Sequence, residues 1–208
     1  MTQVVQDTQV ARWLRRTRES RLGTLVVLVV TGLVVWAGTY ALSRPQEASA
    51  SSTVTSVTSV TLTGAPGQAP VVGRPAPDFT ATTTDGREIS LASLRGHPVW
   101  LTFGASWCAA CRSEAPDTEA AYQRAEASGA VVVEVFISED SATVRDYGAR
   151  VGLTYPKIAD PDTLIASQYR VLGIPAHFFV DASGVLRTVK AGSLTSERMD
   201  AALAGVAR

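Results

Sequence analysis

Hydrophobic and polar positions divide the chain into an uncharged apolar segment, a polar stretch and a region of short alternating elements. No charged residue occurs from Leu22 to Leu42. A helix of about 20 apolar residues is what crosses roughly 30 Å of bilayer hydrocarbon. Residues 22–42 are therefore predicted to form a transmembrane helix. A buried core helix is the alternative, but such a helix normally carries a polar face that this segment lacks.

The charges flanking this segment predict its orientation. Five arginines lie between residues 12 and 21, whereas Arg44 alone follows closely. Because positive flanks stay in the cytoplasm, residues 1–21 are expected to be cytoplasmic and the remainder extracytoplasmic, in a single-pass protein of the cell membrane. A cleaved signal peptide is the rival interpretation, with a cleavage site at Ala48-Ser49-Ala50, although the apolar stretch is longer than a usual signal core.

Residues 43–70 are rich in Ser, Thr, Ala, Gly and Pro and nearly free of charge. Such a composition cannot bury enough apolar surface to offset its ordering entropy, so a flexible linker is predicted. The repeat between Val54 and Thr61 has β-propensity, but without a partner strand we expect it to remain extended and mobile.

From Val71 to Arg208 the pattern predicts one α/β domain. The expected strands are 80–83, 87–90, 98–104, 131–137, 177–181 and 185–190, and the expected helices are 108–128, 141–151, 163–169 and 195–207. The very apolar run at 131–137 is typical of the interior of a parallel sheet. Strand and helix alternate before a closing hairpin and helix, which predicts a central mixed sheet flanked by helices.

Charge and cysteine content narrow the function. The net charge is zero, with 6 basic and 3 acidic residues before Val71 and 13 and 16 from there on, so no basic surface for nucleic acid is expected. Cys108 and Cys111 are the only cysteines. Two cysteines are too few for a framework of several disulfides, and a metal site would have to recruit His97, His177 or a carboxylate. We expect no metal and no nucleic-acid partner.

The two cysteines form a C-x-x-C motif at the junction of a predicted strand and helix. The first thiol of such a motif lies at a helix N-terminus, where free N–H groups and the helix dipole stabilise a thiolate. Cys108 is therefore the predicted nucleophile. Cys111, one turn further on, can resolve a mixed disulfide. Two buried cysteines acting as small hydrophobes are the alternative.

The sequence FGASWCAACRSEAP, residues 103–116, resembles the F-W-A-x-W-C-x-x-C-R-x-E-x-P signature of membrane-tethered thioredoxin-like oxidoreductases of the TlpA/ResA kind. The likeness begins near Pro75 and continues to the C-terminus. It implies a thioredoxin-like fold, a redox-active Cys108–Cys111 disulfide with no other cofactor, disulfide-containing client proteins such as apocytochrome c, and a membrane thiol as electron donor.

The resemblance also assigns site residues. Pro175 is expected to be cis and to lie against the cysteines, with the backbone of Ile174 and Pro175 binding an incoming peptide. Trp107 is expected to pack beside Cys108 and to limit its access to solvent. Glu114 matches the family's active-site glutamate and is the predicted proton acceptor for Cys111; a solvated carboxylate on the helix face is its alternative.

The chain departs from the family pattern at three places. Gly104 stands where the family has Trp, and Ala109-Ala110 lacks the usual Pro between the cysteines. Thr102 stands where ordinary thioredoxins have a buried Asp. The resemblance therefore does not fix the redox potential or the direction of electron flow.

Two other functions compete with this interpretation. A peroxiredoxin-like peroxidase shares the entry at Pro75–Phe79, but Leu101 and Ala105 stand where such enzymes have Pro and Thr. A Sco-like copper chaperone would use His177, yet those proteins space their cysteines C-x-x-x-C. A histidine on a strand is more often a packed residue than a ligand.

Overall fold

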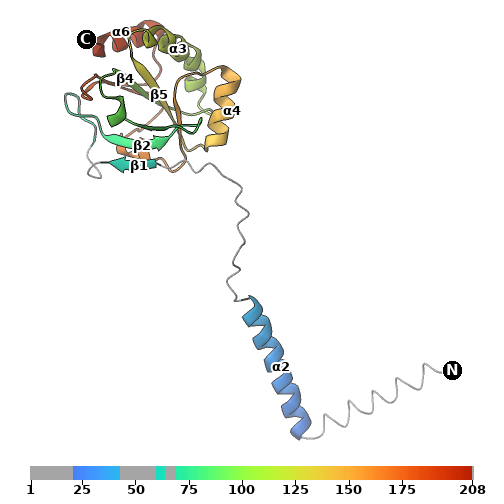
Figure 1. Ribbon diagram of the computed structural model, residues 1–208. Helices are drawn as coiled ribbons and strands as arrows, with labels where there is room; N and C mark the ends of the chain where they lie inside the picture. The colour runs from blue at the N-terminus through green and yellow to red at the C-terminus, as the bar shows by residue number, and fades with distance from the viewer. Residues whose placement is uncertain (1–20, 43–59, 64–68, 208) are drawn as a thin grey trace, which may run out of the picture. The chain divides into compact units, whose positions relative to one another are not determined.

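The computed structural model describes residues 21–42, 60–63 and 69–207, which belong to two separate units (Figure 1). The first unit contains α2 (Arg21–Leu42), a helix where the sequence predicted one. Within the described ranges, no helix is long and apolar enough to cross a membrane. Membrane attachment through residues 22–42 thus stays a prediction from the sequence. The expected cytoplasmic segment, apart from Arg21, and most of the expected linker lie outside the described residues.

The second unit is built on a mixed sheet with strand order β6-β5-β4-β7-β8. The central strand β4 pairs in parallel with β5 and antiparallel with β7. β6 continues the parallel side, and β8 closes the antiparallel side. This confirms the predicted mixed sheet. Its strands are β4 (Val99–Gly104), β5 (Val131–Ile137), β6 (Lys157–Asp160), β7 (Ala176–Val180) and β8 (Leu186–Ala191).

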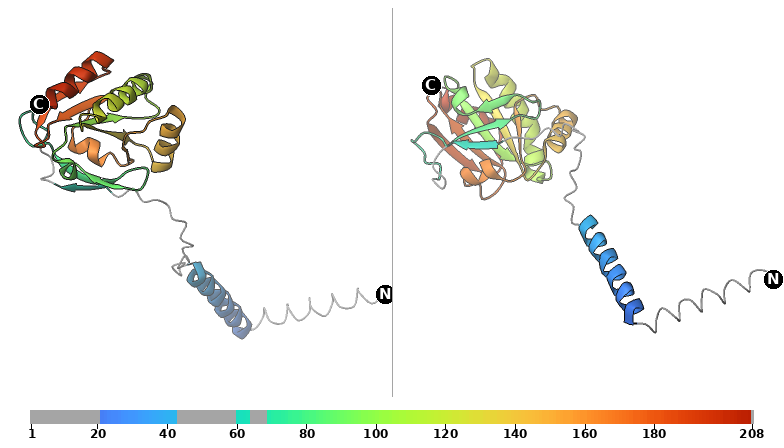
Figure 2. Two further views of the ribbon diagram at one scale, coloured as in Figure 1. Left: turned by 45° about the horizontal axis from the view of Figure 1, so that its top comes forward. Right: turned by 60° about the horizontal axis from the view of Figure 1, so that its bottom comes forward.

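Helices and a second, smaller sheet cover the two faces of the central sheet. On one face α3 (Ala109–Glu126) and α6 (Ser196–Val206) lie side by side, while α4 (Ser141–Val151) packs near β6 (Figures 1 and 2). The core on the other face includes residues of α5 (Leu164–Gln168) and of the small antiparallel sheet. That sheet consists of β1 (Val60–Thr63), β2 (Asp78–Thr82) and β3 (Glu88–Ser90), followed by the short helix η1 (Ala92–Leu94).

Strand β1 corrects the prediction for the linker. Residues 60–63 were expected to lack a partner, but Val60–Thr63 pairs antiparallel with β2, and Val60 packs against the core. The β-prone sequence Val-Thr-Leu-Thr satisfies its backbone groups once the edge of a neighbouring strand is available. The folded unit therefore begins before residue 71.

The two faces of the central sheet receive alternate side chains. In β4, Leu101 and Phe103 join one apolar cluster, and Trp100 joins the other. Because successive side chains of a strand point to opposite faces, Thr102 and Gly104 share the face of Trp100, toward α3. The side of β4 that carries Thr102 and Gly104 therefore faces the helix that begins with the cysteine motif.

Strand β6 was not among the strands expected from the sequence. The strand has four residues, of which Ile158 and Ala159 are its buried apolar ones, so its pattern is too short to read in isolation. Pairing with β5 defines it. Asp160, at its end, is fully buried and accepts hydrogen bonds from the N–H groups of Leu164, Ile165 and Ala166.

We predict that Asp160→Ala lowers the free energy of unfolding by about 2 kcal/mol or more, because it leaves buried N–H groups at the start of α5 without an acceptor. Urea denaturation measures the loss. Asp162→Ala, at a neighbouring exposed aspartate, is the control and should change stability by less than about 0.5 kcal/mol. Equal losses in the two variants would contradict this role of Asp160.

Candidate active site

Cys108 and Cys111 form a disulfide between the end of β4 and the first turn of α3, with their Cα atoms 5.3 Å apart. Cys108 is the N-cap residue of α3, and the Cys111 N–H donates to its Sγ at 3.1 Å. An N–H group aimed at this sulfur, together with the helix dipole, favours a thiolate at Cys108 once the disulfide is reduced. The geometry thus has the arrangement predicted from the motif.

The exposure of the two cysteines does not distinguish them in the disulfide form. Cys108 is 9% exposed and Cys111 is 7% exposed, and both lie in a small apolar cluster with Ala105, Ile137 and Ile174. The identity of the nucleophile therefore rests on the helix N-terminus at Cys108.

The loop before β7 lies against the cysteines. The Ile174–Pro175 peptide bond is cis, as expected, and the carbonyl oxygen of Ile174 is 3.9 Å from Cys108 Sγ. A cavity of about 350 Å³ runs beside this loop and the end of β8, lined in part by Leu172 and Lys190. Leu172 is 99% exposed. An extended peptide placed along the loop would meet both backbone and apolar side chains.

Trp107 is more exposed to solvent than the sequence predicted. It was expected to pack beside Cys108, but it is 58% exposed. Hydrogen bonds fix the turn that carries Trp107, because Ser106 donates to the Glu139 carboxylate through both its N–H and its hydroxyl. Arg112 also donates to the Ser106 carbonyl at 3.1 Å. With its backbone fixed in this way, the indole of Trp107 faces solvent.

Glu114 is buried, at 5% exposure, so the alternative of a solvated helix-face carboxylate is wrong. Its Oε1 accepts from the Leu194 N–H at 3.1 Å and lies 3.5 Å from His177 Nε2. Its Oε2 is buried with no hydrogen-bond partner among the described residues. Burial raises the pKa of Glu114 to about 7, against the lowering effect of the Leu194 N–H.

His177 is a packed residue in this structure. Its Nδ1 lies 3.3 Å from the Trp100 Nε1–H that donates to it and 3.0 Å from the Thr102 hydroxyl, while Nε2 is 3.2 Å from the Gly192 carbonyl. Burial lowers the pKa of His177 to about 4, so the ring is neutral near pH 7. Within the described part of the chain, no group of three or more His, Cys, Asp or Glu side chains could hold a metal ion.

Glu134 is a second buried carboxylate near the site, and it was not predicted from the sequence. It lies in β5 opposite Thr102 of β4, which in turn is opposite His177 of β7. A polar row therefore crosses three strands beneath α3. The Tyr155 hydroxyl donates to Glu134 Oε2 at 2.6 Å, and burial raises the pKa of Glu134 to about 7. The available signal was a single acid inside the apolar run VVVEVFI.

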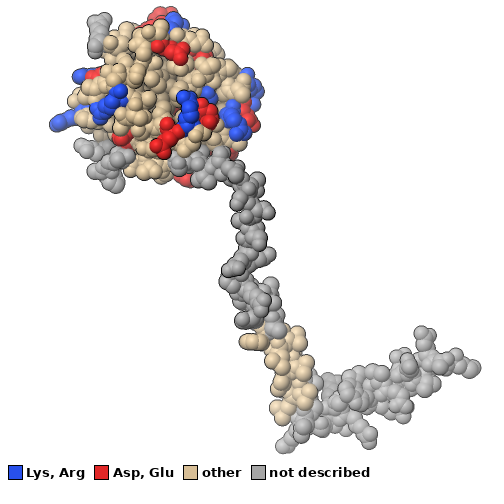
Figure 3. All heavy atoms as spheres, in the orientation of Figure 1, with Lys and Arg blue, Asp and Glu red and all other residues tan. Residues whose placement is uncertain are grey.

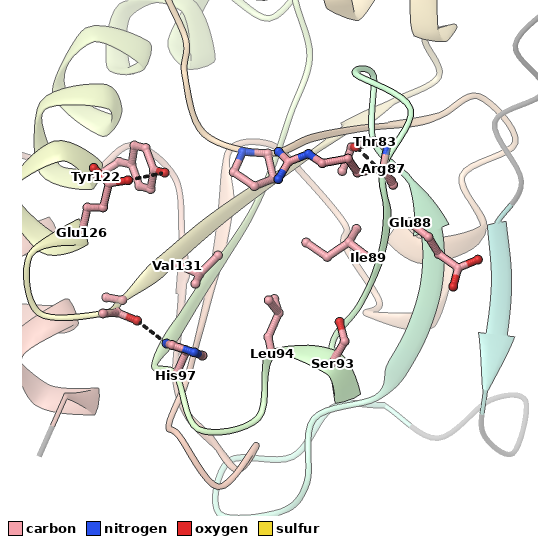
Figure 4. A pocket seen from close by; sticks show the side chains of 13 residues that line it. Thr83, Arg87, Glu88, Ile89, Ser93, Leu94, His97, Tyr122, Glu126 and Val131 are labelled. Atoms are coloured by element: carbon pink, nitrogen blue, oxygen red, sulfur yellow. Dashed lines mark hydrogen bonds between the residues drawn. The ribbon is translucent and has the colours of Figure 1, made fainter.

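A larger cavity of about 450 Å³ lies away from the cysteines (Figure 4). Ile89, Leu94 and Val131 contribute apolar walls, and His97 Nδ1 is 2.8 Å from the Gly129 carbonyl at its rim. His97 and Val131 lie at the N-terminal ends of β4 and β5, whereas the cysteines follow the C-terminal end of β4. The cavity is therefore separate from the redox site. On the face of the unit in Figure 3, acidic and basic side chains are interspersed.

Comparison with known proteins agrees with this geometry. Residues 72–189 match the sequence profile of the AhpC/TSA family. The thiol-disulfide oxidoreductase ResA of Geobacillus thermodenitrificans is 32% identical over 126 residues, which cover 61% of this chain and 72% of that protein.

Two solved structures are similar in fold. A thioredoxin-family thiol:disulfide interchange protein of Chlorobium tepidum has a TM-score of 0.61 and 30% identity, covering 67% of this chain and all of that one. A secreted disulfide oxidoreductase of Mycobacterium tuberculosis has a TM-score of 0.56 and 26% identity, covering 61% and 95%. The chain therefore belongs to the AhpC/TSA family and is a thioredoxin-like homologue of ResA.

Proposed function

We propose that this protein is a thiol-disulfide oxidoreductase that reduces disulfides in client proteins through Cys108 and Cys111. The observation that carries the proposal is the disulfide at the N-terminus of α3, with the cis-proline loop 3.9 Å from Cys108 Sγ. The names of its relatives support the same reaction class.

The reaction begins with the reduced pair. The Cys108 thiolate attacks a client disulfide, which forms a mixed disulfide and releases one client thiolate. Cys111 then attacks Cys108 Sγ, so that the intramolecular disulfide forms and the second client sulfur leaves. Two electrons pass from the cysteine pair to the client. A thiol donor returns the pair to its reduced state.

The loop at Ile174 and Pro175 is proposed to bind the client backbone near the attacking sulfur, and the exposed Trp107 to contact client side chains. An extended peptide there can form hydrogen bonds with the backbone of the loop. Apocytochrome c is the proposed client and a membrane thiol the proposed electron donor, on the strength of the family resemblance.

An extracytoplasmic location at the membrane is the remaining part of the proposal. The uncharged segment 22–42 with arginines before it supports this location, as does the similarity to a protein described as secreted. The atoms of α2 that Figure 3 colours are free of Lys, Arg, Asp and Glu. Disulfide exchange with client proteins also suits an oxidising compartment.

We predict that the protein reduces insulin disulfides with dithiothreitol as electron source, and that Cys108→Ser lowers the rate to that seen without protein, because the attacking sulfur is gone. Turbidity of the precipitating insulin chain follows the reaction. Ala109→Ser, which adds the same hydroxyl one residue away, is the control and should keep most of the activity. Full activity of Cys108→Ser would end the redox interpretation.

We also predict that Cys111→Ala accumulates mixed disulfides with clients, because the resolving thiol is absent while Cys108 remains activated. Nonreducing gels with mass spectrometry of the shifted bands identify the trapped proteins, and Cys108→Ala should trap far fewer. Apocytochrome c among the adducts would support reductive maturation, whereas a broad set of secreted proteins would favour an oxidase. Equal trapping by both variants would show that Cys108 is not the nucleophile.

For the location, we predict that the full chain stays with membranes during alkaline extraction and that protease added outside degrades its folded unit. Val30→Arg combined with Leu33→Arg should weaken retention, since each charge near the middle of a span costs about 3 kcal/mol. A released protein whose N-terminus lies near Ser51 would instead identify a cleaved signal peptide.

A further inference from the structure

The carboxylate of Glu134 lies in the sheet directly behind the cysteine pair. Glu134 is 8% exposed and belongs to the face of β5 that is turned toward α3. The Tyr155 hydroxyl holds Oε2 at 2.6 Å. The other oxygen, Oε1, approaches the backbone of Gly104 so closely that a methyl group on that residue would lie only 2.6 Å from it.

Cys111 approaches the same point from α3. The methyl position on Gly104 is 3.6 Å from Cys111 Sγ and 3.6 Å from its Cβ. Because this methyl position is 2.6 Å from Glu134 Oε1 and 3.6 Å from Cys111 Sγ, the oxygen and the sulfur are at most 6.2 Å apart. Residue 104 has no side chain that could stand between them. A larger residue at this position would fill the space that joins the carboxylate to the sulfur.

We propose that Glu134 is a catalytic residue that accepts the thiol proton of Cys111 when Cys111 resolves the mixed disulfide. This inference rests on the proposed function and adds a proton acceptor to it. Glu114, the acceptor expected from the family resemblance, accepts the Leu194 N–H at Oε1 on the side of His177, and its Oε2 has no hydrogen-bond partner among the described residues.

The proposed step balances in protons and electrons. The Cys111 thiol gives its proton to the Glu134 carboxylate, and the resulting thiolate attacks Cys108 Sγ. The Cys108–Cys111 bond forms while the bond from Cys108 to the client breaks. The client sulfur leaves with the electron pair and takes a proton from water. Glu134 ends as a carboxylic acid beside the new disulfide and returns its proton to solvent.

The surroundings of Glu134 suit proton exchange near neutral pH. Desolvation raises its pKa to about 7, near the pH at which a general base is most effective. The hydrogen bond from Tyr155 acts in the opposite direction. The ionisable groups around it come from several elements: Glu114 of α3, Tyr147 of α4, Lys157 of β6, Glu139 after β5 and Tyr155 itself.

The first test measures the acidity of Cys111 without requiring turnover. In the full chain with Cys108→Ala, Cys111 is the only thiol, so its alkylation by iodoacetamide reports its thiolate directly. We expect a pH profile with two steps, one belonging to Glu134. Adding Glu134→Gln should remove the lower step and make alkylation at pH 7 several-fold faster, because a negative charge beside the thiolate is lost.

The second test measures insulin reduction between pH 5 and pH 9. Glu134→Gln keeps an acceptor for Tyr155 but cannot take a proton, so the rate at pH 7 should fall by roughly 100-fold although the Cys111 thiol becomes more acidic. Tyr155→Phe retains the carboxylate and raises its pKa, so the acid limb should move to higher pH. Glu119→Gln is the control, since this buried glutamate binds Thr154 away from the cysteines.

The outcomes separate the inference from the proposed function. An active wild-type protein whose rate, pH profile and Cys111 alkylation are unchanged by Glu134→Gln overturns the role of Glu134 and leaves the oxidoreductase intact. An inactive wild-type protein refutes the oxidoreductase itself. If Glu134→Gln does not fold, the shift with Tyr155→Phe decides, and an unmoved acid limb counts against Glu134.

Discussion

The position of the redox pair depends on the way that β4 ends. This strand is buried along its whole length, so it cannot leave the sheet until Gly104. The chain then turns through Ala105–Trp107 and enters α3 with Cys108 as the cap residue. A helix that starts immediately beyond a buried strand directs its free N–H groups at its first side chain. The fixed strand and the helix start thus place one sulfur where it can be charged.

The space beneath that helix is unusual because it holds carboxylates among its apolar side chains. Glu114 and Glu134 are both buried, so desolvation raises the pKa of each, and the charge of Glu114 raises the pKa of Glu134 further. Burying two acids in one region costs stability unless they are hydrogen-bonded or neutral. The Tyr155 hydroxyl donates a hydrogen bond to Glu134, and the Leu194 N–H donates one to Glu114. A site of this kind exchanges some stability for acid-base chemistry near neutral pH.

The sequence predicted most elements because their patterns are local. The helix at Ser141–Val151 and the strand at Val131–Ile137 agree with the structure at both ends, and the cysteine motif pointed to the pair that the structure joins in a disulfide. Strands β1 and β6 were not predicted, because a four-residue strand is defined only by its pairing with a neighbouring strand. The exposure of Trp107 and the position of Glu134 near the cysteines were not predicted for a related reason. Side-chain exposure and cross-strand contacts depend on the assembled sheet.

The two buried acids also connect the electron chemistry to the acidity of the surroundings. Reduction of the disulfide adds thiol protons in the same space where Glu114 and Glu134 change charge near pH 7. Where reduction changes the pKa of either acid, the midpoint potential of the pair varies with pH differently from that of an isolated dithiol. For a two-electron couple, a tenfold change in the equilibrium constant corresponds to about 30 mV. The pH of the compartment would thus set the driving force that the protein delivers to a client.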